Sequence, residues 1–337
     1  MLAQTCRHAI LTANCIKAHG RARYRRQGEI ALIRHSVFLG TIVSAGLCAA
    51  SAAGAADSER CQGLSRRYEI ARPQITAMEV SLTLFSAVDG NCLDLATQLL
   101  DQGASVDARD RLGARPLSHA ARSGHLPMVE LLLARGAPID ARDLAGATAL
   151  YFAAEGSHIS IAERLIERGA NVTLTGRSGI SPVTAAAYAG NDRIVAALLA
   201  AGADARAADD TGKPPIIYAA AGARLDVVQR LLTRNIDINA RYANDLTLLM
   251  WAAGPDESVP ETQAIKVVSY LLDAGAHIDD RDNRGRTALM IAAEGGHAEI
   301  ADLLLARGAD RSLKDKAGKR AADLTVLSSL RERLTQP

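Results

Sequence analysis

The amino-acid sequence predicts an all-α protein in which short helical units repeat in tandem and stack into a solenoid. Three observations predict this fold class. Two series of glycines recur with a spacing of 33 residues, Ala-Ala pairs recur between them at the same spacing, and Leu- or Ile-rich pairs precede each glycine of one series. Periods of this length are typical of stacked repeats, in which each unit buries its apolar face only against its neighbours.

Residues 1–56 are predicted to be an N-terminal leader that contains a signal peptide. The stretch 36–56 has no charged residue, follows an Arg-rich segment and ends in Ala53-Gly54-Ala55, which has the form of a signal-peptidase site. An uncleaved membrane anchor formed by residues 36–56 is the alternative. Because the segment before the apolar run is long for a signal peptide, translation could also begin near Leu32. The expected localisation is periplasmic or secreted.

Two of the five cysteines, Cys61 and Cys92, lie outside the leader. An even pair in an exported protein permits one disulfide. The alternative is that Cys92 is a turn residue and Cys61 a free thiol, because sequence spacing does not fix the separation of the two Cα atoms.

Residues 57–79 are predicted to cap the N-terminal end of the array. Leu64, Ile70, Ile75 and Met78 could form an apolar lid over the first unit. Pro73 should break any helix in this segment, because its ring clashes with the preceding turn.

Residues 80–314 are predicted to hold seven units, each with a short helix, a tight turn, a longer helix and a loop. One glycine series should end the second helices, where a left-handed residue is needed; Asn235 replaces glycine in one unit. Its glycines are Gly103, Gly136, Gly169, Gly202, Gly275 and Gly308. The other series lies in the loops at Gly113, Gly146, Gly179, Gly212, Gly285 and Gly318, with Asp245 in one place. Neither helix is long enough to be stable alone, so neighbouring units must stack.

The fifth full unit, residues 242–281, contains an insertion near residues 254–263 and is expected to be the most distorted. Its acidic residues Asp256, Glu257 and Glu261 should lie at the opposite end of the helices from the loops. Trp251, the only tryptophan, adjoins the insertion. It either packs under the longer turn or forms an aromatic anchor at a binding surface.

Residues 315–337 are predicted to form a partial C-terminal capping repeat. Leucines recur there at helical spacing while charged residues fall between them, which indicates an amphipathic helix with one apolar face. The leucines are Leu324, Leu327, Leu330 and Leu334.

Composition and motifs favour a binding protein over an enzyme. Residues 1–56 hold seven of the 39 basic and one of the 37 acidic residues, so residues 57–337 have 32 and 36 and a formal charge of −4. Such a mildly acidic body does not indicate nucleic-acid binding. No phosphate-binding glycine loop, nucleophile elbow or metalloprotease motif occurs, so we expect no catalytic residue, no cofactor, no metal and no small-molecule substrate.

The recurring histidines and aspartates are interpreted as architecture, because they repeat with the period of the units. The histidines, at the inter-helix turns, are His125, His158 and His297. The aspartates, which should accept hydrogen bonds from loop N–H groups, are Asp110, Asp143, Asp209, Asp282 and Asp315.

The unit at residues 282–310, "DNRGRTALMIAAEGGHAEIADLLLARGAD", resembles the ankyrin repeat almost throughout, and the match extends in register over residues 80 to about 330. The resemblance implies an all-α ankyrin-repeat solenoid that binds another protein and performs no chemistry. No unit keeps the histidine of the family's Thr-Pro-Leu-His signature. The hydrogen-bonding role that the resemblance gives this histidine is therefore absent or rebuilt.

The resemblance also implies that the tips of the hairpin loops face the partner. The cationic residues predicted there are Arg109, Arg111, Arg142, Arg177, Lys213, Arg241, Arg281, Arg284, Arg286, Lys314, Lys316 and Lys319, against Asp210 as the one acid. This one-sided charge predicts a partner with an acidic surface. The alternative is that the tip residues only keep the loops soluble or pair with neighbouring aspartates.

We therefore expect an exported, non-enzymatic scaffold or protective binding partner of another protein. A periplasmic immunity protein and a secreted effector that binds a host protein are the alternatives. Contact with a membrane is expected only through an uncleaved leader.

Overall fold

The computed structural model describes residues 59–255 and 258–335. The predicted leader, including the signal-peptide or anchor segment 36–56, lies outside the described residues, as do Asp256 and Glu257. The chain forms two compact units, residues 1–71 and 72–337, and the division falls inside the segment predicted as an N-terminal cap. None of the helices in the described ranges is long and apolar enough to cross a bilayer.

In the described part of the first unit, residues 59–71 are helical. This helix ends directly before a 3₁₀ turn, η1 (Arg72–Gln74), which contains Pro73 as predicted. The predicted apolar lid is wrong in part, because the side chains of Ile70 and Met78 are exposed to solvent.

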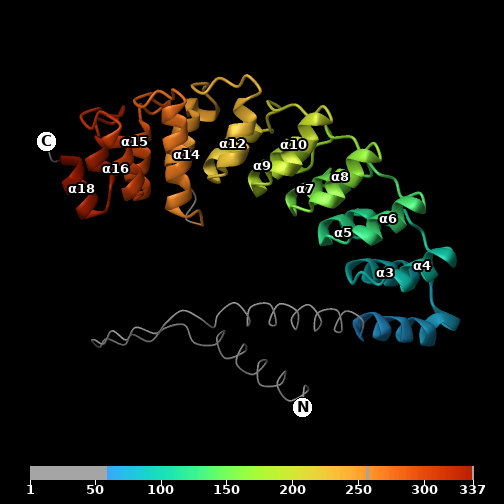
Figure 1. Cartoon of the computed structure of the whole chain (residues 1–337). Coiled ribbons are helices and arrows are strands. Elements are labelled where there is room, and N and C mark those ends of the chain that lie inside the picture. The colour runs from blue at the N-terminus through green and yellow to red at the C-terminus, as the bar shows by residue number, and fades with distance from the viewer. Residues whose placement is uncertain (1–58, 256–257, 336–337) are drawn as a thin grey trace, which may run out of the picture. The chain divides into compact units, whose positions relative to one another are not determined.

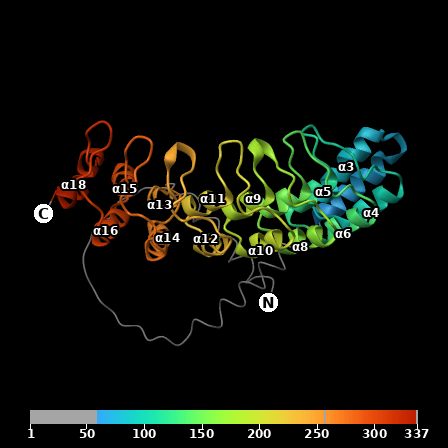
Figure 2. The same cartoon turned by 90° about the horizontal axis from the view of Figure 1, so that it is seen from above.

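The second unit is a row of helix pairs joined by hairpin loops (Figures 1 and 2). The pairs are α3 (Ala77–Asp89) with α4 (Leu93–Asp101), α5 (Pro116–Ser123) with α6 (Leu126–Ala134), α7 (Ala149–Glu155) with α8 (Ile159–Glu167), α9 (Pro182–Ala189) with α10 (Asp192–Ala200), α11 (Pro215–Ala221) with α12 (Leu225–Leu232), α13 (Leu248–Ala253) with α14 (Glu261–Asp273), α15 (Ala288–Gly295) with α16 (Ala298–Ala306), and α17 (Ala321–Leu324) with α18 (Ser328–Thr335). Figure 2 shows the hairpins projecting beyond the first helices of the pairs, with the second helices on the far side. No strand occurs among the described residues.

Several first helices begin at a capping hydroxyl. Thr148, Ser181 and Thr287 each accept a hydrogen bond from the N–H group three residues later, which satisfies one of the donors that a helix start leaves open. A residue with positive φ follows each second helix, two residues after its end or three after α12, at all seven predicted places, including Asn235 at 55°. The predicted helix ends are therefore confirmed.

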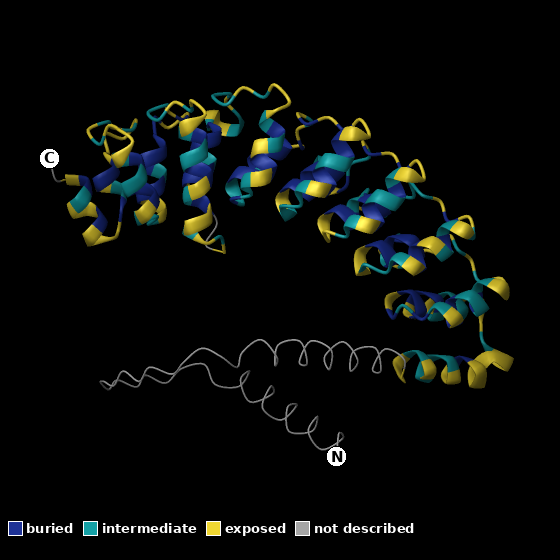
Figure 3. Cartoon of the chain, in the orientation of Figure 1, coloured by how far each residue is buried: buried dark blue, intermediate teal, exposed yellow. Residues whose placement is uncertain are grey.

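The core lies between the two rows of helices and is made of small and aliphatic side chains (Figure 3). The Ala-Ala pairs of the first helices are fully buried and allow these helices to approach closely. One fully buried leucine in each second helix from α4 to α16 fills the layer between units, at Leu99, Leu132, Leu165, Leu198, Leu231, Leu271 and Leu304. The apolar layers match the expectation from an Ala- and Leu-rich, aromatic-poor sequence.

The insertion lengthens the second helix of the fifth full unit as well as the turn before it. Helix α14 has 13 residues, whereas the other second helices of the repeats have eight or nine. Glu261, predicted to be an acidic loop residue, begins this helix. Its Oε1 atom accepts hydrogen bonds from the N–H groups of Glu299 (2.9 Å) and Ile300 (3.1 Å), so it caps α16 of the next unit.

At the C-terminal end, the predicted leucine stripe is confirmed at Leu330 and Leu334, which are buried, whereas Leu327 is exposed. Arg331, one of the charged residues between these leucines, is exposed. Its guanidinium also donates to the carbonyl oxygens of Ala322 (3.2 Å) and Thr325 (2.7 Å) at the end of α17, where a cation stabilises the helix terminus.

Candidate functional site

The aspartates that open the hairpin loops form turns and not a catalytic pair. In the first hairpin, Oδ1 of Asp110 accepts hydrogen bonds from the N–H groups of Leu112 and Ala114, both at 2.8 Å. The same two-bond pattern recurs at Asp143, Asp209, Asp282 and Asp315. The predicted Asx-type turns are confirmed, and they fix the loop that carries the tip residues.

The second carboxylate oxygen rebuilds part of the bonding lost with the signature histidine. Oδ2 of Asp110 lies 3.0 Å from Nε2 of His119, and Oδ2 of Asp209 accepts from the hydroxyl of Tyr218. His119 and Tyr218 stand one residue after the signature position. Each ties the first helix of its unit to the hairpin.

These contacts set the charge state of the hairpin carboxylates. Burial alone would raise the pKa of Asp209, but hydrogen bonds from Tyr218, Lys213 and Thr211 outweigh it and lower the pKa below its usual value. Burial, with the adjacent Asp209 carboxylate, raises the pKa of Tyr218. Both groups therefore keep their ordinary charge at neutral pH, as a structural contact requires.

Backbone hydrogen bonds join some hairpins to the preceding one but not others. The bonds run from Leu144 N to Leu112 O (2.9 Å), Asp210 N to Ser178 O (3.0 Å), Asn283 N to Asn244 O (3.1 Å) and Lys316 N to Arg284 O (2.9 Å). Each of the four donors directly follows a turn aspartate. The two hairpins that begin with Gly176 and Tyr242 in place of this aspartate donate no such bond within the described residues. The hairpins are thus joined in three groups.

Three of the predicted tip arginines brace neighbouring hairpins. Arg142 donates to the carbonyl oxygen of Thr175 at 2.9 Å, and Arg281 donates to that of Lys314 at 3.4 Å. Arg241 donates to the carbonyl oxygen of Arg281 at 2.5 Å. Each bond links the same place in consecutive units, so these side chains have an architectural role.

The structure corrects the prediction for Arg286. This residue is only 7% exposed, and its guanidinium pairs with Asp282 and Glu294, so a partner protein cannot reach it. Arg284 is exposed but lies 3.5 Å from the Asp282 carboxylate. Lys213 is half-buried, and its Nζ lies 5.1 Å from the ring centroid of Trp251.

Arg109, Arg111 and Arg177 are the tip arginines that project without a hydrogen bond or an ion pair to any part of the chain that the structure describes. Between them lie two exposed apolar side chains, Leu112 at 63% and Leu144 at 81% exposed. We call these five residues the basic edge. It belongs to the hairpins nearest the N-terminal end of the array.

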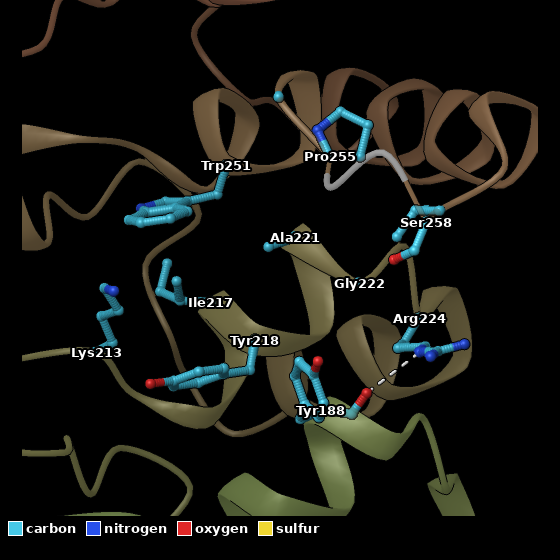
Figure 4. Close-up of a pocket in the computed structure, with 12 residues that line it drawn as sticks. Tyr188, Lys213, Ile217, Tyr218, Ala221, Gly222, Arg224, Trp251, Pro255 and Ser258 are labelled. Atoms are coloured by element: carbon cyan, nitrogen blue, oxygen red, sulfur yellow. Dashed lines mark hydrogen bonds between the residues drawn. The ribbon is translucent and has the colours of Figure 1, made fainter. Parts of the chain in front are cut away.

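A second surface feature lies beside α9, α11 and α13, where Tyr188, Lys213, Tyr218, Arg224 and Trp251 line a pocket of about 360 Å³ (Figure 4). Both open interpretations of Trp251 meet here, because the ring packs near the insertion and also lines the pocket. The two tyrosines and Arg224 belong to no motif in the sequence that indicates a binding site. Their signal was the gathering of aromatic residues in an aromatic-poor chain.

The remaining predicted residues have structural surroundings. His158 Nε2 lies 2.9 Å from the carbonyl oxygen of Arg122 in the preceding unit, in line with the architectural interpretation. No cluster suited to a metal ion occurs in residues 59–255 and 258–335. Neither Cys61 nor Cys92 is a free thiol; their pairing with one another stays a prediction that peptide mapping with and without reductant would test.

The family profile described as "Ankyrin repeats (3 copies)" matches residues 84–176, 174–242 and 240–315, which is more than half of the chain. The chain belongs to the ankyrin repeat family. The crystal structure of the human ASB11 ankyrin repeat domain superimposes with a TM-score of 0.58 and 28% sequence identity, covering 66% of this chain and 96% of that one. The predicted fold class is therefore confirmed.

Curated relatives match shorter segments of the ankyrin array. Human ankyrin repeat domain-containing protein 63 is 42% identical over 82 residues, which is 24% of this chain and 20% of that protein. The NAD-capped RNA hydrolase NUDT12 of Macaca fascicularis is 36% identical over 69 residues, or 20% of this chain and 15% of the hydrolase. The aligned segments span about a fifth or less of these relatives. Ankyrin repeats are protein–protein interaction modules, and this coarser function holds for the array.

Proposed function

We propose that this ankyrin-repeat protein is exported and binds an acidic protein partner through the basic edge, as a scaffold or protective partner in the cell envelope. One observation carries the proposal. Arg109 and Arg111 on the first hairpin and Arg177 on the third are exposed and make no ion pair within the described residues, on a body whose formal charge is −4. Cations held on braced loops beside the exposed Leu112 and Leu144 suit a surface in which carboxylates surround an apolar patch.

The charge-reversal variant Arg109→Glu, Arg111→Glu, Arg177→Glu tests the basic edge. A partner captured from the envelope fraction is purified, and its affinity for the full chain is measured at several salt concentrations. We expect the variant to weaken binding by about tenfold or more and to flatten the salt dependence, because the attraction is lost and repulsion replaces it.

The matched control reverses three exposed cations that lie away from the hairpins, in the variant Arg168→Glu, Arg234→Glu, Lys266→Glu. The change in net charge is the same, so a general charge effect would weaken both variants equally. Equal affinity of the wild type and the basic-edge variant would show that the edge is not the binding face.

Export has its own test. The proposal expects the mature chain in the periplasmic or secreted fraction, with an N-terminus close to Ala55. An intact leader recovered with the membrane fraction would favour the anchor alternative, and recovery of the chain in the cytosol would contradict export.

A further inference from the structure

Among the residues that the structure describes, the lining of the pocket beside α9, α11 and α13 carries charge of one sign. Its two charged lining residues, Lys213 and Arg224, are both basic. In Figure 4, Lys213 lies beside the Trp251 ring, and Arg224 lies at the other end of the hollow, past Ala221. The rings of Tyr188 and Tyr218 lie along the lower side of the same view. Two cations among aromatic rings favour an anionic occupant.

The polar groups of this pocket have unused capacity to donate hydrogen bonds. Arg224 uses its Nε atom for the carbonyl oxygen of Tyr188 at 3.3 Å, and its terminal nitrogens make no bond within the described residues. Nε1 of Trp251 is buried and lacks an acceptor there as well. The terminal nitrogens of Arg224 can therefore donate hydrogen bonds to an oxygen atom that enters the pocket.

The hollow arises from small residues at one position of the repeat. Helix α9 carries Tyr188 at this position, whereas α11 carries Ala221 and the insertion unit carries Gly254. Tyr188 is therefore left 63% exposed beside a gap. A second hollow of about 180 Å³ adjoins the first and shares Tyr188 and Tyr218 with it. We call the two hollows together the groove; the second hollow also contains Glu155, whose carboxylate accepts a hydrogen bond from the hydroxyl of Tyr151 at 3.4 Å.

We propose that this groove binds an extended segment of the protein partner, with an Asp or Glu carboxylate between Lys213 and Arg224 and an adjacent apolar side chain in the second hollow. The inference rests on the proposed function, because it assumes an acidic protein partner. A groove lined by residues of α7, α9, α11 and α13 runs along several units and suits an extended segment better than a folded domain. Exposed aromatic side chains are favoured contact groups in such sites.

A peptide array tests which chemistry the groove accepts. The full chain is incubated with short immobilised peptides, each acidic peptide paired with a copy in which Gln replaces Glu and Asn replaces Asp. We expect the bound peptides to carry a carboxylate next to an apolar residue and their amide copies to bind about tenfold more weakly or not at all. Binding without preference for carboxylates, or binding of no peptide, would overturn the inference.

Trp251 then reports where the best peptide binds, because it is the only tryptophan in the chain. Titration should change its emission in a saturable way. The double variant Lys213→Gln, Arg224→Gln should weaken peptide binding by about tenfold. The single variant Lys213→Arg keeps Arg224 and a cation at position 213, so it should bind the peptide more tightly than the double variant. The matched control Arg168→Gln, Arg234→Gln should respond like the wild type. Glutarate, a free dicarboxylate, serves as the small-molecule arm; if it saturates the site as tightly as the peptide, the protein-segment assignment is wrong.

Tyr188→Ala keeps the test valid if the double variant does not fold, because Tyr188 is exposed and contributes little to the core. We expect it to weaken peptide binding as well; an unchanged affinity would contradict the inference. The basic-edge variant should titrate like the wild type with the peptide. If only the basic-edge variant loses partner binding, the groove inference is wrong and the proposed function stands. If only the Lys213→Gln, Arg224→Gln variant loses partner binding, the basic edge is not the binding face and the groove inference stands.

Discussion

At the scale of single residues, the hairpin carboxylates connect sequence, charge and stability. Asp209 is buried, yet its pKa is lowered because both oxygens accept hydrogen bonds. A group whose pKa is lower in the folded state stabilises the fold above its unfolded pKa and loses this contribution as the pH falls through the folded value. The turn aspartates are therefore acid-sensitive parts of the array.

We predict that Asp209→Asn lowers the free energy of unfolding by about 1–3 kcal/mol at neutral pH, because the amide nitrogen cannot accept from Tyr218. The difference from the wild type should narrow below about pH 4, where the carboxylate of the unfolded chain takes up a proton while the folded one, with its lowered pKa, resists it. Urea denaturation followed by circular dichroism at several pH values measures it. Asp210→Asn is the control, since that exposed carboxylate makes no hydrogen bond within the described residues; a gap that stays constant with pH would contradict the prediction.

At the scale of elements, the hairpins are held both by their own turns and by side chains from neighbouring units. Arg142 lies where the backbone bond between two hairpins is missing, and its guanidinium links the two through the carbonyl oxygens of Gly146 (3.0 Å) and Thr175 (2.9 Å). Arg109 occupies the same place in the preceding unit and makes no bond within the described residues. Identical residues at identical places of the repeat thus differ in role.

This difference gives a paired prediction. Arg142→Ala should lower the free energy of unfolding by about 0.5–1.5 kcal/mol, because two hydrogen bonds to carbonyl oxygens are lost. Arg109→Ala should change it by less than about 0.5 kcal/mol, as is usual for exposed residues without such contacts. Thermal or urea unfolding of both variants measures these changes. Equal changes in the free energy of unfolding would show that Arg142 does not stabilise the hairpins.

At the scale of the whole molecule, the missing backbone bonds divide the hairpin row into three groups. In a solenoid each unit contacts only its neighbours, so weak junctions become places of local opening. We predict that hydrogen exchange is faster at the amides of Arg177 and Ala243 than at those of Leu144, Asp210, Asn283 and Lys316, which occupy the same place and donate to the preceding hairpin. Equal protection at all six amides would show that the junctions are energetically alike.

The sequence by itself determined the helical repeat, its period of 33 residues, the helix ends and the turn aspartates. These features depend on local backbone conformation and on which face of a short helix is apolar, and both leave a pattern in the chain. Only the tertiary structure decided the roles of the cations. Arg286 is buried in an ion-pair cluster, Arg142 spans two hairpins and Lys213 lies against Trp251. The physical reason is that a long side chain pairs with whatever the stacked neighbour presents, about 30 residues away along the chain, and the repeat pattern does not encode that partner.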